Sequence, residues 1–249
     1  MMTAASALIT QAMVLSAGRG ERLRPLTDTA PKPLLTIGDR PLLVHQLQRL
    51  HMAGIEHVVI NLGWLGEQIP KALEEWLSQP PLLKLKVSYS QEPQGALETA
   101  GGIRHAIDRF TPGPVVVISA DAWCDLDYRQ LTTHRLQRAG HLIMVDNPNH
   151  HPAGDFVLDD GMIQLPKDST ERTVTFAGLG VFSTELFGQL PEGHRRLRPV
   201  LESAIRAEQL TGTHFKGQWL DLGTPERLQT ARDQWMGAWP STRPPSESI

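Results

Sequence analysis

Short apolar runs alternate along this chain with segments whose apolar residues recur every three or four positions. Runs at 12–15, 58–60 and 115–118 suit buried strands, and the periodic segments between them suit amphipathic helices. Such alternation is the sequence form of repeated βαβ units, which fold as a parallel sheet with helices on both faces. We therefore expect an α/β fold of three layers around a mixed, mostly parallel sheet.

The segments between these runs place the other elements of the first half. Pro41 is a favourable first residue for a helix, and Gly54 is placed to end that helix. The helical pattern then resumes before a run in which apolar and polar residues alternate, as they do in a half-exposed strand. The further elements expected here are a helix at 65–76, a strand at 83–89, a loop at 92–102 and a helix at 103–107.

The pattern is looser after residue 140. Asp159, Asp160 and Gly161 predict the turn of a hairpin, and Gly178 and Gly180 interrupt a long apolar strand. Glycines inside a strand often mark a bulge or a close approach to the backbone. The elements expected here are strands at 142–145 and 173–182, hairpins at 156–165 and 215–222, and helices at 197–209 and 225–235.

Composition narrows the class of protein. The 249 residues carry a net charge of -3, whereas general nucleic-acid binders have a basic surplus, so nucleic acid is not an expected partner. The single cysteine, Cys124, excludes an internal disulfide framework and fits a reducing compartment. The first ten residues lack Lys and Arg and do not resemble a signal peptide, and no segment suits a membrane span. We expect a cytoplasmic protein, a monomer or small homo-oligomer, with one domain at 11–236 and flexible ends at 1–10 and 237–249.

A glycine turn with several cations follows the first apolar run directly. The sequence from position 15 reads LSAGRGERLRPLT, and PKP comes shortly after it. Gly18 and Gly20 let the backbone bend tightly and approach a polyanion, while Arg22 and Lys32 supply positive charge. The P-loop and dinucleotide fingerprints do not fit, because no Gly-Lys-Ser/Thr opens a helix and position 23 is Leu rather than Gly. The turn therefore indicates a site for a nucleoside triphosphate.

Two aspartates follow apolar strands, where ligands gather in an open α/β sheet. Asp121 ends the central run, and Asp221 lies between an apolar segment and a helix start. Each has a structural alternative. Asp121 could instead cap a helix, although Asp125 and Asp127 are better placed for that role. Asp221 could instead place a favourable negative charge at the start of the helix that Thr224 caps. Because Mg²⁺ takes one or two carboxylates and completes its shell with phosphate and water, the pair indicates a magnesium site.

The motif G-x-G-x-R-L-x-P-L-T with the following P-K-P resembles the signature of the sugar nucleotidyltransferases, over roughly residues 11–236. Members of that family join a sugar 1-phosphate to a nucleoside triphosphate and release pyrophosphate, on a Rossmann-like fold. The resemblance implies catalytic roles for Arg22, Lys32 and Asp121, with Mg²⁺ held by Asp121 and Asp221. It assigns the β and γ phosphates to Arg22, and the α-phosphate and sugar phosphate to Lys32.

The nucleotide-binding half, at about 11–140, is expected to recognise the base through backbone groups of the glycine loop. A second segment is expected to line the opposite side of the base pocket. Residues 97–102, LETAGG, start a helix, and in the family a similar loop contacts the nucleobase. Gln68 and Gln91 are either surface glutamines or partners for a uracil edge. The nucleotide-binding residues expected on this basis are Leu15, Ala17, Gly18, Gly20, Arg22, Lys32, Gln91, Leu97, Thr99 and Gly101.

The sugar-binding half, at about 141–236, contains the polar loop DNPNHHPAGDF after a strand. Its adjacent histidines suggest zinc, but adjacent side chains rarely share one metal and no cysteine is near. A sugar-binding loop fits better, with Asn147, Asp155 and Gly178 as the sugar-binding residues. The Glu-Lys-Pro motif of larger relatives is missing, and Lys167 lies in that region without its context, which leaves the cation for the sugar phosphate open.

Three functions remain as hypotheses. The polar loop resembles the branch that acts on N-acetylated amino sugars, so we expect a UTP-dependent uridylyltransferase. Its preferred sugar is N-acetylmuramic acid 1-phosphate, and its context is cell-wall sugar recycling. The alternative enzymes are a mannose 1-phosphate guanylyltransferase and a glucose or N-acetylglucosamine 1-phosphate uridylyltransferase. A non-catalytic nucleotide-binding regulator is disfavoured because Arg22, Lys32, Asp121 and Asp221 are all present.

Overall fold

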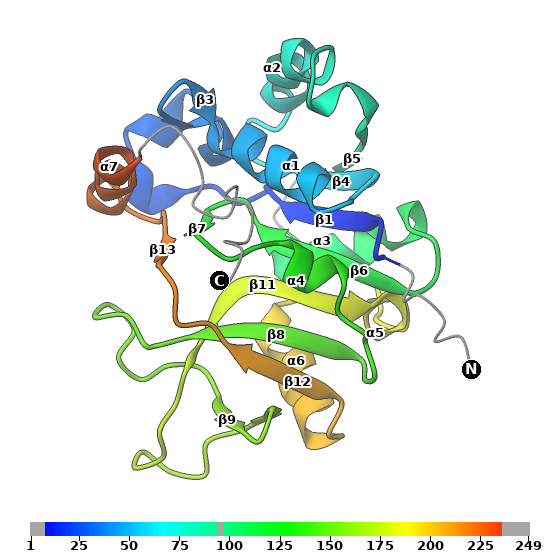
Figure 1. The fold of residues 1–249 in the computed structure, drawn as a ribbon, viewed down its shortest axis with the longest axis vertical. Coiled ribbons are helices and arrows are strands. Elements are labelled where there is room, and N and C mark those ends of the chain that lie inside the picture. The colour runs from blue at the N-terminus through cyan, green and yellow to red at the C-terminus, as the bar shows by residue number, and fades with distance from the viewer. Residues whose placement is uncertain (1–7, 94–96, 236–249) are drawn as a thin grey trace, which may run out of the picture.

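The computed structural model describes residues 8–93 and 97–235, which form one nine-stranded sheet with helices on both faces (Figure 1). The strand order is β5-β4-β1-β6-β11-β8-β12-β10-β9. Strands β10 and β11 run against the direction of the other strands, because each pairs antiparallel with both of its neighbours. The α/β fold with a mixed, mostly parallel sheet is therefore confirmed.

Helices and strands alternate in the first half, and strands dominate the second. The strands of the sheet are β1 (Gln11–Leu15), β4 (His57–Leu62), β5 (Lys86–Gln91), β6 (Pro114–Ser119), β8 (Gly140–Val145), β9 (Val157–Asp159), β10 (Met162–Gln164), β11 (Thr175–Ser183) and β12 (Leu210–His214). The α-helices are α1 (Leu42–Met52), α2 (Gln68–Leu77), α3 (Glu98–Ala106), α4 (Arg129–Thr132), α5 (Thr184–Gly188), α6 (Leu197–Arg206) and α7 (Pro225–Gln234). Two short antiparallel pairs lie outside the sheet: β2 (Thr36–Ile37) with β3 (Arg40–Pro41), and β7 (Ala122–Cys124) with β13 (Trp219–Asp221).

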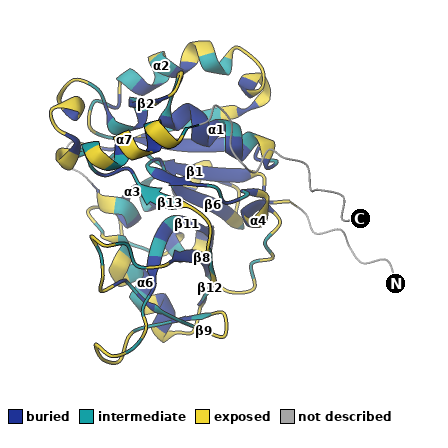
Figure 2. Ribbon diagram, turned by 60° about the vertical axis from the view of Figure 1, so that its left-hand side comes forward, coloured by how far each residue is buried: buried dark blue, intermediate teal, exposed yellow. Residues whose placement is uncertain are grey.

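Successive residues of the strands face two separate cores, one on each side of the sheet. In β1, Ala12 and Val14 pack in the core beneath α1, α2 and α4, whereas Met13 packs in the core beneath α3, α5 and α6. A strand covered on both faces needs apolar side chains at every position, which explains the continuous apolar runs. Figure 2 shows these strands buried between helices whose outer faces are exposed. A third cluster, which includes Leu23 and Leu228, joins α7 to the loop after β1.

Two boundaries in the first half differ from the sequence-based prediction. The strand expected at 83–89 begins at Lys86, because Leu82–Lys84 forms a short 3-10 helix that buries Leu82. The helix expected at 103–107 already begins at Glu98, so the last five residues of the expected loop at 92–102 are helical. Close packing explains the glycines inside this helix: a Cβ on Gly101 would lie 2.3 Å from Gly193 O.

The hairpin expected at 215–222 does not form. Strand β12 instead pairs parallel with β8, and β13 pairs antiparallel with β7. The helix expected to reach residue 209 ends at Arg206, because the fully buried Leu210 already belongs to the sheet. Both pairing partners are distant in sequence, so local turn chemistry could not indicate them.

The turn and the bulge predicted in the second half are confirmed. Strands β9 and β10 pair across the turn that contains Asp160 and Gly161, both of which have a positive φ. The pairing of β11 with β8 shifts register between Phe176 and Gly180, in the segment where glycines interrupt the apolar run. The bulge brings Gly178 (φ 76°) against the end of β6.

The flexible ends expected at 1–10 and 237–249 lie mostly outside the described residues. Residues 8–10 are described: Ile9 is buried, its amide donates to Thr132 O at 2.9 Å, and Thr10 O accepts from His57 N at 3.0 Å. None of the described helices is long and apolar enough to cross a membrane.

Candidate active site

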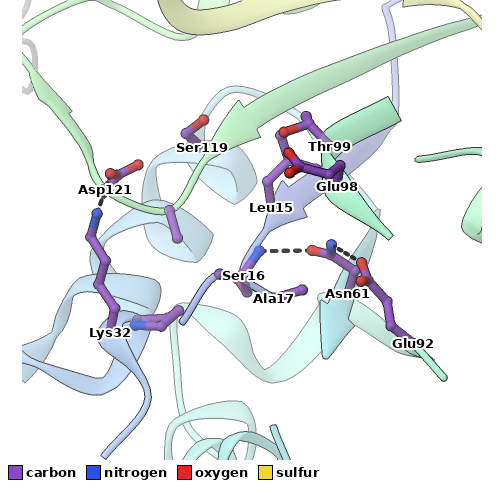
Figure 3. Close-up of a pocket in the computed structure, with 13 residues that line it drawn as sticks. Leu15, Ser16, Ala17, Lys32, Asn61, Glu92, Glu98, Thr99, Ser119 and Asp121 are labelled. Carbon is purple, nitrogen blue, oxygen red and sulfur yellow. Dashed lines mark hydrogen bonds and ion pairs between the residues drawn. The ribbon is translucent and has the colours of Figure 1, made fainter. Parts of the chain in front are cut away.

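A cavity of about 360 Å³ opens at the carboxyl ends of β1, β4, β5 and β6 (Figure 3). This is the edge at which an open α/β sheet binds its ligands. The glycine loop after β1 lies on one side, the start of α3 on the other, and Asp121 and Lys32 at one end. The lining residues are Leu15, Ser16, Ala17, Gly18, Lys32, Pro33, Asn61, Glu92, Glu98, Thr99, Ser119, Ala120 and Asp121.

A buried polar chain joins the two walls of this cavity, and the sequence prediction missed it. Asn61 accepts a hydrogen bond from Ser16 N (2.7 Å) and donates to Glu92 Oε1 (2.7 Å), and Glu92 Oε2 accepts from Leu97 N (3.1 Å). These hydrogen bonds therefore fix the glycine loop relative to the start of α3; Figure 3 shows the two that involve Asn61. Asn61 and Glu92 lie at the ends of β4 and β5, so the rule that singled out Asp121 also applied to them.

A second cavity of about 380 Å³ lies on the other side of Asp121, under the bulge of β11. Ser119 and Asp121 line both cavities, so the two spaces meet at the end of the central strand. The residues that line the second cavity are Arg22, Ser119, Asp121, Ala122, His150, His151, Thr175, Phe176, Ala177, Gly178, Trp219 and Asp221.

Strand pairing brings the two predicted carboxylates together. In the β7–β13 pair Asp221 lies opposite Ala122, and Leu222 N donates to Asp121 O at 3.0 Å. Asp121 forms an ion pair with Lys32, as the dashed line in Figure 3 shows. The sequence prediction of a site built from these residues on distant segments is consistent with this arrangement.

Asp221 is held by three groups. Its Oδ1 accepts from Gly223 N (2.9 Å) and pairs with Arg227 (2.8 Å), and its Oδ2 lies 2.8 Å from His150 Nε2. Arg22 packs against the same backbone, since a Cβ on Gly223 would lie 2.7 Å from its guanidinium. Arg22 therefore lines the second cavity, beside Asp221, while Lys32 lines the first.

A buried relay from α1 supports the backbone on either side of Asp121, and the sequence prediction missed it too. Gln46 Nε2 donates to Ala122 O (2.7 Å) and, at 3.5 Å, to Ala120 O. Gln46 Oε1 accepts from the Tyr128 hydroxyl (2.6 Å), which accepts from Arg49 (3.0 Å). Complete burial raises the pKa of Tyr128, so its hydroxyl stays a neutral donor. No sequence signal marks Gln46, which looks like any polar residue on a helix.

The glycine loop is shaped partly by its own contacts. Gly20 has a φ of 66°, a left-handed conformation that favours glycine at this point of the turn. Arg19 stacks 3.5 Å from the centre of the Trp64 ring and pairs with Asp28 (3.2 Å). Arg24 pairs with Asp28 as well (2.8 Å), so both arginines are held away from the cavity.

The predicted wall at 97–102 lines the cavity through Glu98 and Thr99. Leu97 and Gly101 are buried behind that surface, and the Gly101 amide donates to Arg195 O at 3.1 Å. Gln91 does not line the cavity; its amide donates to the carbonyls of Leu62 and Glu92 instead. The base contacts expected of these residues stay predictions, and Thr99 is the one with direct access.

The predicted sugar-binding residues play different parts. Gly178 lines the second cavity. Asn147 lies behind the lining, where it donates to Thr173 Oγ1 (2.9 Å) and accepts from Thr175 (2.8 Å). Asp155 does not line the cavity either, and it contacts His151, which does. These contacts show both side chains holding their own loop, so direct contact with a sugar stays a prediction.

Lys167 lies apart from the candidate site. That residue lies outside both cavities, and its amide donates to Glu171. Arg22 and Lys32 are the Arg or Lys side chains that line the two spaces.

The donor set at the junction of the cavities suits magnesium. Asp121, just before β7, and Asp221, in the paired strand β13, offer carboxylate oxygens, and Mg²⁺ takes one or two carboxylates with phosphate and water completing its octahedron. Within the described part of the chain, no three His, Cys, Asp or Glu side chains gather as a metal-binding group. A site with two carboxylates suits a cation that is also bound by a phosphate of the substrate. It suits a cation bound only by protein ligands less well.

The fold and the site together define a nucleotide-binding transferase. The chain belongs to the nucleotidyl transferase family, whose model matches residues 11–236. It is 40% identical over 234 residues to N-acetylmuramate alpha-1-phosphate uridylyltransferase of Neisseria meningitidis serogroup B, covering 92% of this chain and 99% of the relative.

Two further similarities are more distant. The chain is 30% identical to the mannose-1-phosphate guanylyltransferase catalytic subunit beta of Danio rerio, over 88% of this chain and 63% of that protein. Among solved structures, UDP-glucose pyrophosphorylase complexed with UDP-glucose matches with a TM-score of 0.75 at 19% identity, covering 91% of this chain and 98% of that one. This likeness shows that the chain has the same fold.

Proposed function

We propose that this chain is a Mg²⁺-dependent uridylyltransferase that joins UTP to N-acetylmuramic acid 1-phosphate. The products are UDP-N-acetylmuramic acid and pyrophosphate. One geometric observation supports the reaction class: Asp121 lines both the cavity behind the glycine loop, where it pairs with Lys32, and the second cavity under β11, which Asp221 also lines. The choice of substrates rests on the Neisseria relative, which matches over nearly its whole length.

The reaction needs no nucleophile from the protein. An oxygen of the sugar 1-phosphate attacks the α-phosphorus of UTP, the bond to the β-phosphate breaks, and pyrophosphate leaves with that electron pair. The main obstacle is the approach of two anions. At about 4 Å, two unit charges of like sign repel by roughly 4 kcal/mol at an effective dielectric of about 20. The protein therefore has to position both substrates and supply positive charge.

The two cavities divide the substrates. The first, between the glycine loop and α3, takes the nucleoside of UTP, and the second takes the sugar, so the reacting phosphates meet at Ser119 and Asp121. Lys32 neutralises charge at the α-phosphate from the first cavity, and Arg22 contacts the phosphates from the second. Asp121 and Asp221 hold Mg²⁺, which lowers the repulsion between the phosphates when it is bound.

The alternative function is a mannose-1-phosphate guanylyltransferase. The Danio rerio relative supports this alternative, but the chain spans less than two thirds of that protein and shares fewer residues with it. Cytoplasmic location, the oligomeric state and a place in cell-wall sugar recycling stay predictions.

Pyrophosphate release across a matrix of substrates tests this proposal. UTP, GTP, CTP and dTTP are each paired with the 1-phosphates of N-acetylmuramic acid, N-acetylglucosamine, glucose and mannose. We expect the highest kcat/KM for UTP with N-acetylmuramic acid 1-phosphate. A maximum for GTP with mannose 1-phosphate would replace the proposal by its alternative, and no release from any pair would reject the reaction class.

A further inference from the structure

Two adjacent histidines line the second cavity, which takes the sugar in the proposed function. His150 and His151 come from the loop between β8 and β9, but they contact different partners. The ring of His150 lies 2.8 Å from Asp221, a proposed metal ligand, whereas the ring of His151 lies 3.2 Å from Asp155. The two rings therefore line the same cavity but contact different carboxylates.

His151 is held in a fixed frame. Asp155 Oδ1 contacts its Nε2, and Asp155 Oδ2 accepts from Phe176 N at 2.9 Å on the bulged strand β11. Arg198, at the start of α6, adds a contact of 3.5 Å to Asp155 Oδ1. The loop around His151 is braced as well, because its amide donates to Pro148 O at 2.8 Å. A side chain with this much support is suited to recognition, since its orientation is set before a ligand binds.

The remaining cationic side chains around the cavity already have partners near the reacting phosphates. His150 faces Asp221, and Arg22 packs beside Asp221 and belongs to the phosphate-binding loop. Among the described residues that line this cavity, His151 is the histidine whose ion-pair partner is not a proposed metal ligand. It can meet a negative charge on the substrate other than the phosphate.

We propose that His151 binds a carboxylate on the sugar, and so selects a sugar acid over its neutral counterpart. This inference rests on the proposed function. N-acetylmuramic acid carries a lactyl carboxylate on its ring, and N-acetylglucosamine is the same sugar without that group. In this arrangement Nε2 of His151 donates to Asp155, and the second ring nitrogen donates to the lactyl carboxylate. Asp155 is thus a positioning residue, which replaces its predicted role as a direct ligand of sugar hydroxyls.

The test compares the affinities of two sugar phosphates for the whole protein by calorimetry. N-acetylmuramic acid 1-phosphate and N-acetylglucosamine 1-phosphate are titrated with Mg²⁺ and a non-reacting α,β-methylene analogue of UTP present. His151→Gln keeps a polar side chain but removes the charge. A charge-assisted hydrogen bond corresponds to about a 10- to 100-fold preference, so the ratio of the two affinities should fall by that factor in the variant.

His150→Gln is the matched control, because it makes the same change one residue away on the same cavity. It should weaken both sugar phosphates by similar factors, since Asp221 lies near the part that the two sugars share. Asp155→Asn should lower the preference for the sugar acid less than His151→Gln does. An unchanged ratio in His151→Gln, with circular dichroism matching the wild type, would overturn the inference.

The same titrations separate this inference from the proposed function. If the wild-type protein binds both sugar phosphates and releases pyrophosphate from UTP, but His151→Gln keeps its preference, the inference alone is wrong. If the wild-type protein binds neither sugar phosphate and releases no pyrophosphate, the proposed function is wrong, and the inference is rejected with it.

Discussion

Lys32 and Asp121 form an ion pair in the structure, and the proposed reaction gives each a different partner. In that proposal Lys32 contacts a phosphate of UTP, and Asp121 would hold Mg²⁺. Neither residue is fully buried: their side chains are 16% and 28% exposed. Water therefore reaches the pair, and substrates can exchange its partners without leaving a charge isolated.

Asp121→Asn tests the metal role of this carboxylate. The substitution keeps the size of the side chain but removes its charge, so we expect kcat to fall by about 100-fold or more. The melting temperature should change little, because the residue lies at a cavity rather than in the core. Steady-state assays with UTP over a range of Mg²⁺ concentrations measure the effect. Wild-type turnover in the variant would remove Asp121 from the site.

His141 makes stability depend on pH. Burial is the main cause that lowers the pKa of His141 to about 4, and both ring nitrogens contact threonine hydroxyls of β12. Because the unfolded pKa is near 6.5, the neutral ring contributes stability that is complete above that pH and lost as pH falls toward 4. At pH 5 the loss from this residue is about 2 kcal/mol. Urea unfolding at pH 8 and pH 5 should therefore show a smaller pH dependence in His141→Gln, and an equal dependence would contradict the account.

Single residues show how far sequence reasoning reaches. Asp121, Asp221 and Lys32 could be predicted because they follow strands or belong to a compact motif, and the fold brings them together. Asn147 and Gln91 could not be assigned in the same way. A polar side chain in a loop can bind a ligand or bind its own backbone, and the sequence does not distinguish between the two.

At the scale of elements, the strand pair β7–β13 and helix α1 together hold the carboxylates. Leu222 N donates to Asp121 O, and Gln46 donates to the carbonyls of Ala120 and Ala122. The backbone at Asp121 is thus fixed from two sides by segments that lie far apart in the sequence. This arrangement could not be derived from the sequence, because it depends on which strand pairs with β7.

Gln46→Leu should impair catalysis by releasing this backbone. We expect kcat to fall by about 10-fold and the Mg²⁺ concentration for half-maximal activity to rise, because small displacements of a catalytic group are costly. Tyr128→Phe removes the donor to Gln46 and should produce a smaller change in the same direction. Gln48→Leu is the control: it lies on the same helix and contacts Arg40 instead. If Gln46→Leu and Gln48→Leu require the same Mg²⁺ concentration for half-maximal activity, the relay has no positioning role.

Gly101→Ala tests the packing of α3 against the segment before α6. The added Cβ would lie 2.3 Å from Gly193 O, in a segment whose Arg195 carbonyl accepts from the amides of Ala100 and Gly101. Such a clash costs about 1 to 3 kcal/mol of unfolding free energy. Denaturant unfolding measures this loss. Gly188→Ala is a suitable control, since a Cβ at that position would meet nothing within 4 Å, and an equal effect of both changes would refute the packing argument.

For the whole molecule, the alternation of apolar runs was enough to predict the α/β fold, its central strand and the edge that carries the site. The sequence indicated a bulge near Gly178, but it did not show that the bulge would lie over the end of β6 or that β13 would pair with β7. These long-range pairings bring together the segments that line the second cavity. Sequence reasoning therefore predicted the fold and the edge of the sheet at which the cavities lie, but not the shape of those cavities.

The most direct test of the central claim follows the α-phosphate of UTP through the reaction. The purified protein is incubated with α-labelled UTP, N-acetylmuramic acid 1-phosphate and Mg²⁺, and the products are separated by chromatography. The account predicts that the label appears in UDP-N-acetylmuramic acid, with one unlabelled pyrophosphate released for each sugar nucleotide formed. Label that appears in UMP, or remains in UTP while the sugar phosphate is unchanged, would contradict it.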